Sequence, residues 1–486
     1  MARHKRFSAS VAILALLSAC GGGGGSSGGG GGGDTIVTPP PPPPPPPPTA
    51  TCSLSARQSF ALQQINANYL FPEDIDSSVN PASFSSVQAY IDALVAPARA
   101  KNRDRGFTFV TSIAEENALA QTGASAGFGV RLSFDAPARR VLIAEAFEGA
   151  PALAQGIDRG TEILAIGTNA GDLRTVDSII AAEGVGGVTN ALGPSTAGTT
   201  RLLRVRDPGG AFRDVTVTMT VFALDPVSDR YGAKILDDGG RKVGYVNLRT
   251  FSVQSAEQDL RAAFSQFKSQ GVTEVIVDLR YNGGGFVYLA ELLNNLLLNK
   301  SSGTVMGYTT FRASRAGNNR TTFFSPQPES ISSMKIAFIG TRSSASASEL
   351  VMNAALPYLG ANAALIGDNT FGKPVGQEAF DNASCDDRMR VLSFRTENAN
   401  HEGDYFTGLA SKFQSTCRAA DDVTRQLGDP QEASIKAALD FLAGRPCAAP
   451  ITGGGATTQG VREQSTPELV TPETPSTVQR EIPGFF

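Results

Sequence analysis

The chain has 486 residues, of which 42 are Lys or Arg and 46 are Asp or Glu, and its formal net charge is −4. The charged residues form no basic stripe interleaved with aromatic residues, which argues against a nucleic-acid partner. The five cysteines and two histidines form no cluster with metal-ligand spacing, so no metal site is predicted. The length and apolar content allow two or three folded domains.

Residues 1–19 have the order of a secretory signal peptide, with a basic start followed by the apolar run 11–17. The tetrad Leu-Ser-Ala-Cys that ends at Cys20 resembles a bacterial lipobox. This resemblance implies cleavage before Cys20, acylation of Cys20 and attachment to a membrane. The alternative is an ordinary signal peptide with an unrelated cysteine. No later segment offers the roughly 20 uninterrupted apolar residues that a transmembrane helix needs.

Two segments have the composition of linkers or tails. Residues 20–51 combine a glycine-rich run over 21–33 with an unbroken proline run over 39–48. Because glycine runs are flexible and polyproline is semi-rigid, we expect this segment to be a tether. A proline-rich ligand for a partner domain is the alternative. Residues 450–486 are polar and rich in Thr, Pro, Gly and Glu, and we expect them to be disordered.

Between residues 52 and 120, apolar residues recur at helical intervals. They include Phe60, Leu62 and Ile65, and the pattern resumes from Val87 onwards. We therefore predict a small helical N-terminal domain over 52–120.

Residues 121–225 differ from the preceding segment, because short β-branched runs alternate with glycines. Strands are predicted over 140–143, 162–166, 201–205 and 214–220, with a short helix over 150–155. A mainly β domain is expected here.

The turn Gly127, Phe128, Gly129, Val130 opens a strand of this β region. Together with the predicted helix and the segment 160–166, it resembles a PDZ domain of the bacterial protease type. The resemblance implies that the N–H groups of the turn receive a peptide's terminal carboxylate while the peptide adds as a strand to the sheet edge. For the Gly-x-Gly pattern alone, a tight turn in a β-barrel is an equally good explanation.

From residue 226 to residue 449, predicted strands and helices alternate, which is typical of a mainly parallel α/β core. The strands are predicted over 243–248, 272–279, 334–340 and 363–367, and the helices over 256–270, 287–299, 349–356 and 432–443.

The segment 343–349 places four serines between a predicted strand and a predicted helix. A hydroxyl at such a junction lies at the positive end of the helix, near free N–H groups, where a nucleophile would be well placed. The competing explanation is helix capping, because serine is a common N-cap residue.

Lys373 follows the strand 363–367 in a Phe-Gly-Lys turn, at the same edge of the predicted sheet as the serines. The chain has only His4, in the predicted signal peptide, and His401, so a lysine is the most economical base for a serine nucleophile. A neutral amine can accept the serine proton when burial lowers its pKa. Gln377 could hydrogen-bond this amine and orient it.

A third segment follows the strand 272–279 and contains Asn282 and the glycines 283–285. Glycines let backbone N–H groups face a ligand without obstruction by a Cβ atom, so an oxyanion hole is predicted here. A phosphate-binding loop is the alternative use of such glycines, but the segment lacks both characteristic glycine spacings.

These three segments resemble the signatures of the carboxyl-terminal processing peptidases, also called tail-specific proteases. Residues 278–285 are similar to the family's Asp-Leu-Arg-x-Asn-x-Gly-Gly signature, 344–349 to its nucleophile segment and 370–377 to its base segment. The family's nucleophile is the serine directly before the glutamate, 25 residues before the lysine, which here selects Ser348. Pro374 departs from the glycine usual after the lysine, and residues 104–109 match the family's pre-domain motif only loosely.

The resemblance implies a multi-domain fold: a ClpP/crotonase-like α/β catalytic core over 226–449, an inserted mainly β PDZ domain and a small helical N-terminal domain. It implies a serine endopeptidase that cleaves proteins or peptides near their C-termini through an acyl-enzyme. Ser348 would be the nucleophile, Lys373 the base and Gln377 the residue that orients the amine. The oxyanion hole would use backbone N–H groups of Gly284, Gly285, Ser348 and Glu349.

No metal or cofactor is implied. The partners would be polypeptide substrates held by their C-terminal tails and, through the lipid anchor, a membrane. We expect the protein in a bacterial cell envelope, facing the periplasm, on the outer rather than the inner membrane. The oligomeric state is not predicted. The alternative function is a peptide-binding scaffold whose catalytic pair is disabled.

If Cys20 is lipidated, Cys52, Cys385, Cys417 and Cys447 remain as an even set in an oxidising compartment, and four cysteines allow three pairings. The region 382–422 departs from the commonest members of the family and contains both Cys385 and Cys417. We therefore expect Cys385 to pair with Cys417, and Cys52 to pair with Cys447.

Overall fold

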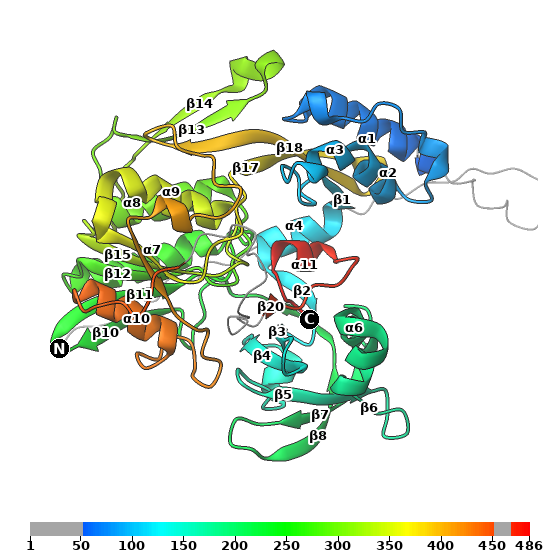
Figure 1. The fold of residues 1–486 in the computed structure, drawn as a ribbon, viewed down its shortest axis with the longest axis horizontal. Coiled ribbons are helices and arrows are strands. Elements are labelled where there is room, and N and C mark those ends of the chain that lie inside the picture. Colours follow the sequence, from blue (N-terminus) through cyan, green and yellow to red (C-terminus); the bar gives the residue numbers. More distant parts are fainter. Residues whose placement is uncertain (1–51, 452–467) are drawn as a thin grey trace, which may run out of the picture. The chain divides into compact units, whose positions relative to one another are not determined.

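The computed structural model of the chain describes residues 52–451 and 468–486, so the predicted signal peptide, Cys20 and the whole predicted tether lie outside the described residues. The described residues belong to one compact unit (Figure 1). Within the described ranges, no helix has the length and apolar character needed to cross a membrane.

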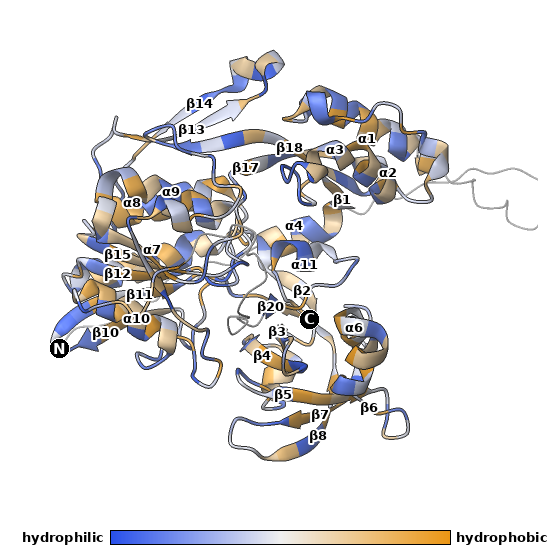
Figure 2. Ribbon diagram, in the orientation of Figure 1, coloured by the Kyte–Doolittle hydropathy of each residue, from blue (hydrophilic) through white to orange (hydrophobic). Residues whose placement is uncertain are grey.

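The core sheet has the strand order β10-β11-β12-β15-β16-β19 and is parallel except for the β10–β11 pair. Its strands are Ala233–Asp238, Arg241–Asn247, Glu274–Asp278, Lys335–Gly340, Ala363–Gly367 and Ser415–Arg418. The central strands are nearly continuous apolar runs, as expected where a parallel sheet is covered on both faces. Figure 2 shows hydrophobic residues along these strands.

Helices cover both faces of the core sheet. The helices are α7 (Ala256–Ser269), α8 (Val287–Leu298), α9 (Ala347–Leu359) and α10 (Ala433–Leu442). The first three share a core with one face of the sheet, including Val275 and Phe338. Helix α10 packs on the opposite face, against Ile276 and Ile339. The predicted α/β core is therefore confirmed, and its predicted strands and helices agree with the structure to within a few residues.

A second, antiparallel sheet was not predicted. Its strand order is β1-β18-β13-β14, with β17 also paired to β18. These strands are Phe109–Ser112, Asp387–Asn398, Val305–Phe311, Arg320–Phe323 and Val375–Asn382. The helices α1 (Leu54–Asn68) and α2 (Val87–Leu94), followed by α3 (Ala96–Ala100), share a core with β17 and β18. The helical residues of 52–120 are thus packed on strands from the far half of the sequence.

The β3 sheet contains the strands predicted in the region 121–225. Its order is β20-β3-β4-β5-β7-β8, with β6 paired to β5. The strands are Glu468–Leu469, Val130–Asp135, Arg140–Ala146, Glu162–Gly167, Thr200–Arg206, Phe212–Thr218 and, for β6, Arg174–Thr175. The helices α5 (Pro151–Ala154) and α6 (Val176–Leu192) pack on this sheet. A separate pair, β2 (Ala124–Gly127) and β9 (Thr220–Ala223), leads into and out of it after α4 (Ile113–Thr122).

The prediction of a disordered tail over 450–486 is wrong for residues 468–486. These residues form β20 and the short helix α11 (Thr477–Glu481), coloured red in Figure 1, which packs beside α4. Ile482, Phe485 and Phe486 are buried. Composition suggested disorder because the apolar residues are few, but they are gathered at the end of the segment, where they enter two cores formed by other elements.

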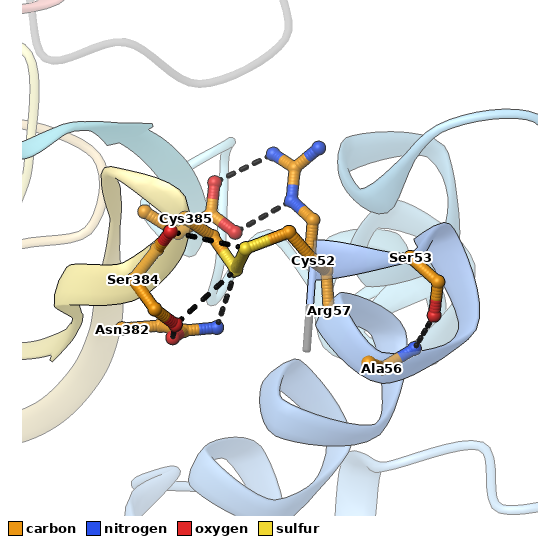
Figure 3. Close-up of a disulfide and its surroundings, with 8 residues drawn as sticks. Cys52, Ser53, Ala56, Arg57, Asn382, Ser384 and Cys385 are labelled. Carbon is orange, nitrogen blue, oxygen red and sulfur yellow. Dashed lines mark hydrogen bonds and ion pairs between the residues drawn. A yellow bond between two sulfur atoms is a disulfide. The ribbon is translucent and has the colours of Figure 1, made fainter. Parts of the chain in front are cut away.

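The predicted disulfide pairing is also wrong. Cys52 pairs with Cys385, with a Cα–Cα distance of 5.4 Å, and Cys417 pairs with Cys447 at 5.5 Å. The turn between β17 and β18 carries Cys385 to the start of α1, where Arg57 also forms a bidentate ion pair with Asp387 (Figure 3).

The second disulfide follows from the path of the chain after α10. That path runs along the edge strand β19, where the Arg418 N–H donates to the Ala449 carbonyl at 2.8 Å. Cys447 is therefore brought to Cys417. The prediction paired Cys385 with Cys417 because they are near each other in one region of the sequence. In the structure, the order of the strands determines which cysteines meet in both disulfides.

Candidate active site

The three predicted catalytic segments follow β12, β15 and β16, which are adjacent strands of the core sheet. Because parallel strands end at the same edge, their loops meet there. The Ala345 N–H donates to the Asn282 carbonyl at 3.1 Å, and the Phe371 N–H donates to the Ser344 carbonyl at 2.9 Å. The structure thus brings the serine, glycine and lysine segments together.

Ser348 lies in the first turn of α9 and is fully buried. Its Oγ donates to the Asn282 carbonyl at 2.9 Å. The N-cap position belongs to Ser346, which has a positive φ of 54°. Capping therefore does not explain Ser348, whose hydroxyl faces the glycine loop at the positive end of the helix.

Gly284 and Gly285 have φ values of +111° and +133°. A Cβ atom on Gly285 would lie 2.2 Å from the backbone carbon of Phe251, so no side chain fits there. In this structure the Gly284 N–H donates to Asn282 Oδ1 at 3.0 Å, and the Ser348 N–H donates to the Ala345 carbonyl at 3.1 Å. Two of the predicted oxyanion donors therefore have acceptors within the protein.

The Lys373 amine donates to Gln377 Oε1 at 2.8 Å and lies 4.7 Å from the centre of the Phe107 ring. Burial lowers the pKa of Lys373; the carboxylates of Glu481, Asp104 and Glu349 oppose this shift, and Arg105 adds to it. Among the hydrogen bonds of the described residues, none joins Ser348 to Lys373. Each of these side chains is bonded to another partner.

Glu349 has a larger role in the geometry than its predicted backbone N–H. Its fully buried carboxylate accepts hydrogen bonds from the N–H groups of Ser346, Gly372 and Lys373, at 3.0, 2.6 and 2.7 Å, and from the Thr370 hydroxyl at 2.6 Å. Burial raises the pKa of Glu349, and these hydrogen bonds oppose the rise. The residue after the candidate nucleophile thus holds the loop that carries the candidate base.

Residues 104–109 contact the candidate base and were missed as site residues. Arg105 Nη2 donates to the carbonyls of Phe371 (2.9 Å) and Gly372, while the Phe107 carbonyl accepts a hydrogen bond from Gln377 Nε2. Asp104 accepts a hydrogen bond from the Tyr69 hydroxyl at 3.0 Å. The signal that could have found these residues was their loose match to the pre-domain motif.

The predicted peptide-binding turn lies where β2 ends and β3 begins. Gly129 has a φ of +78°, and a Cβ atom there would lie 2.0 Å from the Ala150 Cβ. The N–H groups of Gly129 and Val130 donate to the main-chain oxygen of Phe486, at 2.8 and 3.1 Å. Phe128 is buried in the core of the β3 sheet. In this structure the two N–H groups of the turn therefore have an acceptor within the same chain, at residue 486.

Arg131, on β3, links this turn to the glycine loop. Its fully buried guanidinium donates to Glu145 Oε2 at 2.7 Å, to the Tyr281 carbonyl at 3.2 Å and to the Arg249 carbonyl at 3.1 Å. Burial of Glu145 would raise its pKa, but Arg249 and Arg131 lower the pKa to about 2. The two sheets are therefore joined by buried, paired charges, and removing one partner would leave the other uncompensated.

His401 lies outside this arrangement. Its ring stacks on Tyr308 at 4.0 Å between centroids, and its Nδ1 is 3.2 Å from Glu397 Oε2. His4 lies outside the described residues. Among the described residues, a histidine base for Ser348 therefore has no support.

Comparison with known proteins gives the site its context. Residues 242–403, which include the three segments, match the family model "Peptidase family S41". A carboxyl-terminal-processing protease from Picosynechococcus sp. is 27% identical over 264 residues, 54% of this chain and 58% of that protein. The corresponding protease from Synechocystis sp. is 26% identical over 333 residues, 66% of this chain and 70% of that protein.

The chain spans just over half the length of the first of these relatives. A crystal structure of a Bacteroides fragilis chain assigned to the S41 proteases has a similar fold. Its TM-score is 0.62 at 23% identity, covering 79% of this chain and 97% of that one. From the family match and the relatives, we conclude that residues 242–403 of this chain belong to peptidase family S41 and that the chain is similar to the carboxyl-terminal-processing proteases.

Proposed function

We propose that the protein is a serine endopeptidase that cleaves polypeptides near their C-termini with Ser348 and Lys373. One observation carries the proposal: Ser348, at the positive end of α9, and Lys373, which Gln377 orients, belong to segments that the Glu349 carboxylate joins. The lowered pKa of Lys373 supports its role, because a base must be neutral to accept a proton.

In the proposed reaction, Ser348 Oγ attacks the scissile carbonyl carbon while its proton passes to Lys373 Nζ. The amine then protonates the leaving nitrogen, and the C–N bond breaks to leave an acyl-enzyme. Lys373 next takes a proton from water, which attacks the ester; the lysine then returns this proton to Ser348 Oγ as the ester C–O bond breaks, so that the carboxylic acid product leaves and both side chains are restored. Because Ser348 Oγ donates to Asn282 in the resting structure, we propose that it exchanges this acceptor for Nζ when substrate binds.

We further propose that the region 121–225 is a PDZ domain and binds substrate tails. The N–H groups of Gly129 and Val130 converge on one main-chain oxygen, which is the arrangement that receives a peptide's carboxylate. An extended tail would add to the edge of β3. The neighbouring residues 52–120 would form the family's N-terminal region, and Asp104 to Phe109 would support the base.

We also propose that Cys20 carries a lipid anchor and that the glycine and proline runs hold the peptidase away from a membrane. The sequence features that support this are the apolar run ending in Leu-Ser-Ala-Cys and the spacer composition of residues 20–51. The protein would then face the periplasm of a bacterial envelope, on the outer membrane.

A second candidate function is a peptide-binding scaffold with a disabled catalytic pair. It is favoured by the internal acceptors of the Gly284 and Ser348 N–H groups and by the separate partners of Ser348 and Lys373. A resting state of an active peptidase has the same features, so an experiment must decide between the two.

The test is labelling of the full chain with a serine-directed acylating probe, followed by peptide mass spectrometry. We expect one acyl group on Ser348, and no label in Ser348→Ala or Lys373→Ala. Ser343→Ala, a change of a nearby serine, serves as the matched control and should label normally. A folded chain that remains unlabelled and cleaves no fluorogenic peptide would favour the scaffold.

A further inference from the structure

The edge of β3, which we define as residues 129–134, is occupied by residues from the end of the sequence. Residues 484–486 run antiparallel to it: the Phe486 N–H donates to the Val130 carbonyl at 2.9 Å, and the Leu132 N–H donates to the Gly484 carbonyl at 2.8 Å. Residues 468–470 continue the pairing, with Leu469 opposite Ser133. This is the pattern of a peptide that adds a strand to a sheet.

Two side chains anchor this segment. Phe486 is 2% exposed and lies in the core of the β3 sheet. Phe485 is fully buried and stacks on Phe147 and Phe222, with ring centroids 5.8 and 6.0 Å away. Because burial removes both aromatic rings from water, this is a specific contact rather than a loose tail lying on a surface.

The same segment reaches the candidate active site. The Pro483 ring lies against the glycine loop, where a Cβ atom on Gly283 would be 3.0 Å from Pro483 Cδ. The Pro483 carbonyl accepts a hydrogen bond from Arg131 at 2.7 Å, and the Glu481 carboxylate accepts one from the Ser252 hydroxyl at 2.6 Å. One continuous stretch therefore occupies the β3 edge and packs on the loop that is predicted to hold the oxyanion.

We propose that residues 468–486 are a tethered ligand that fills the substrate-tail site and holds the peptidase in a resting state until a substrate tail displaces it. The proposal rests on the proposed function of that site, because it assigns the same N–H groups to substrate. Residues 484–486 and a substrate tail cannot occupy the β3 edge at the same time, because the N–H groups of Gly129 and Val130 already donate to the main-chain oxygen of Phe486. The displacing tails should be extended and end in apolar, preferably aromatic, residues that replace Phe485 and Phe486.

Because residues 468–486 belong to the same chain, they compete with a free peptide at an effective concentration that can reach the millimolar range. At any moment the β3 edge is therefore unoccupied in only a fraction of the molecules. The apparent Kd rises in inverse proportion to that open fraction. Displacement also removes Pro483 and Glu481 from the glycine loop. Displacement of residues 468–486 would therefore both open the β3 edge to a substrate tail and remove the contacts that this segment makes with the glycine loop.

The chain contains no tryptophan, which permits a direct test. Phe486→Trp, made in the full chain with Ser348→Ala to prevent cleavage, places one indole in the occupied pocket. Emission should be typical of a buried indole. A synthetic peptide of residues 476–486 should shift the emission to the red, with saturation, whereas a scrambled peptide of the same composition should not. Phe212→Trp, on the exposed part of β8, is the matched control and should not respond.

A second variant covers the case in which the introduced indole alters the contact. Phe486→Asp places a charge in the apolar pocket and should release the segment, so that the 476–486 peptide binds at least about 10-fold more tightly than to the parent chain. Phe212→Asp should leave the affinity unchanged. If Phe486→Asp does not fold, the indole reporter decides alone.

Emission that stays that of a buried indole at saturating peptide overturns the inference. So does an unchanged peptide affinity in a folded Phe486→Asp chain. Because binding is measured without cleavage, the two proposals fail separately. A chain without peptidase activity whose indole still shifts contradicts the proposed function alone, and an active peptidase whose indole does not shift contradicts the tethered ligand alone.

Discussion

The edge of the core sheet and the edge of β3 both present backbone groups to a ligand, but they are assembled differently. At the core sheet, the serine, glycine and lysine segments follow adjacent parallel strands, so the strand order alone brings them together. At β3, the occupant comes from the far end of the sequence and pairs through main-chain groups that any residue carries. The first site is therefore encoded by motifs, whereas the second depends on which strand edge is left unpaired.

The largest effect is expected when the candidate base, Lys373, is removed from the site at the edge of the core sheet while the β3 edge is left unchanged. Lys373→Ala should lower kcat by at least about 10³-fold on peptides and small esters alike, because the serine proton loses its acceptor. Circular dichroism should show an unchanged fold. His401→Ala is the control and should retain full turnover. Full activity of Lys373→Ala, or loss of turnover in a folded His401→Ala chain, would contradict a lysine mechanism.

A smaller effect is expected where the core site supports its base indirectly. In the parent chain, the Gly372 and Lys373 N–H groups each donate to a Glu349 carboxylate oxygen. In Glu349→Gln, one of these oxygens is replaced by an NH₂ group, which cannot accept a hydrogen bond, so the Lys373 loop should shift. We expect kcat to fall by about 10–100-fold and the free energy of unfolding by on the order of 2 kcal/mol. Urea unfolding and steady-state kinetics measure the two. Unchanged values for both would show that this carboxylate does not hold the loop.

The β3 edge can be disturbed while the core site is left intact. Gly129→Ala combines a positive φ with a Cβ clash against Ala150, whereas Gly149→Ala has a similar φ of +71° and open space. We expect Gly129→Ala to raise KM for peptides with apolar tails by about 10-fold, a loss of about 1.4 kcal/mol of binding, with little change in the hydrolysis of a small ester. Gly149→Ala should raise KM less. Equal effects on ester and peptide would mean that the two sites are not separable in this way.

The smallest effect concerns the contact between the two sites. The Glu481 carboxylate raises the pKa of Lys373, so Glu481→Gln should lower that pKa further. Because the neutral amine is the active form, the rise of kcat/KM with pH should begin at a lower pH, with the plateau unchanged. Glu473→Gln, at an exposed position of the same segment, is the control. A pH profile that does not move, or moves to higher pH, would show that Glu481 does not act on the base.

The sequence by itself determined the elements that carry the candidate chemistry. Buried apolar runs such as 363–367 predicted the parallel strands, because a strand covered on both faces must be apolar throughout. The resemblance to the signatures of the carboxyl-terminal processing peptidases selected Ser348, Lys373 and Gln377, whose segments the structure brings to one edge. The Gly127–Val130 turn was predicted to offer N–H groups, because its glycines permit that backbone.

Only the tertiary structure decided the long-range partners. Three contacts show this: Cys52 pairs with Cys385, the Glu349 carboxylate accepts hydrogen bonds from the Lys373 loop, and Arg105 donates to the same loop. Each contact joins segments that are distant in the sequence, and a local sequence pattern cannot predict which distant segments meet. Residues 468–486 are the clearest case: their composition resembles a linker, yet Phe485 and Phe486 are buried. The physical reason is that strand pairing and apolar burial stabilise any segment that reaches an unpaired strand edge and an incompletely filled core. Such an edge and such a core exist only after the rest of the chain has folded.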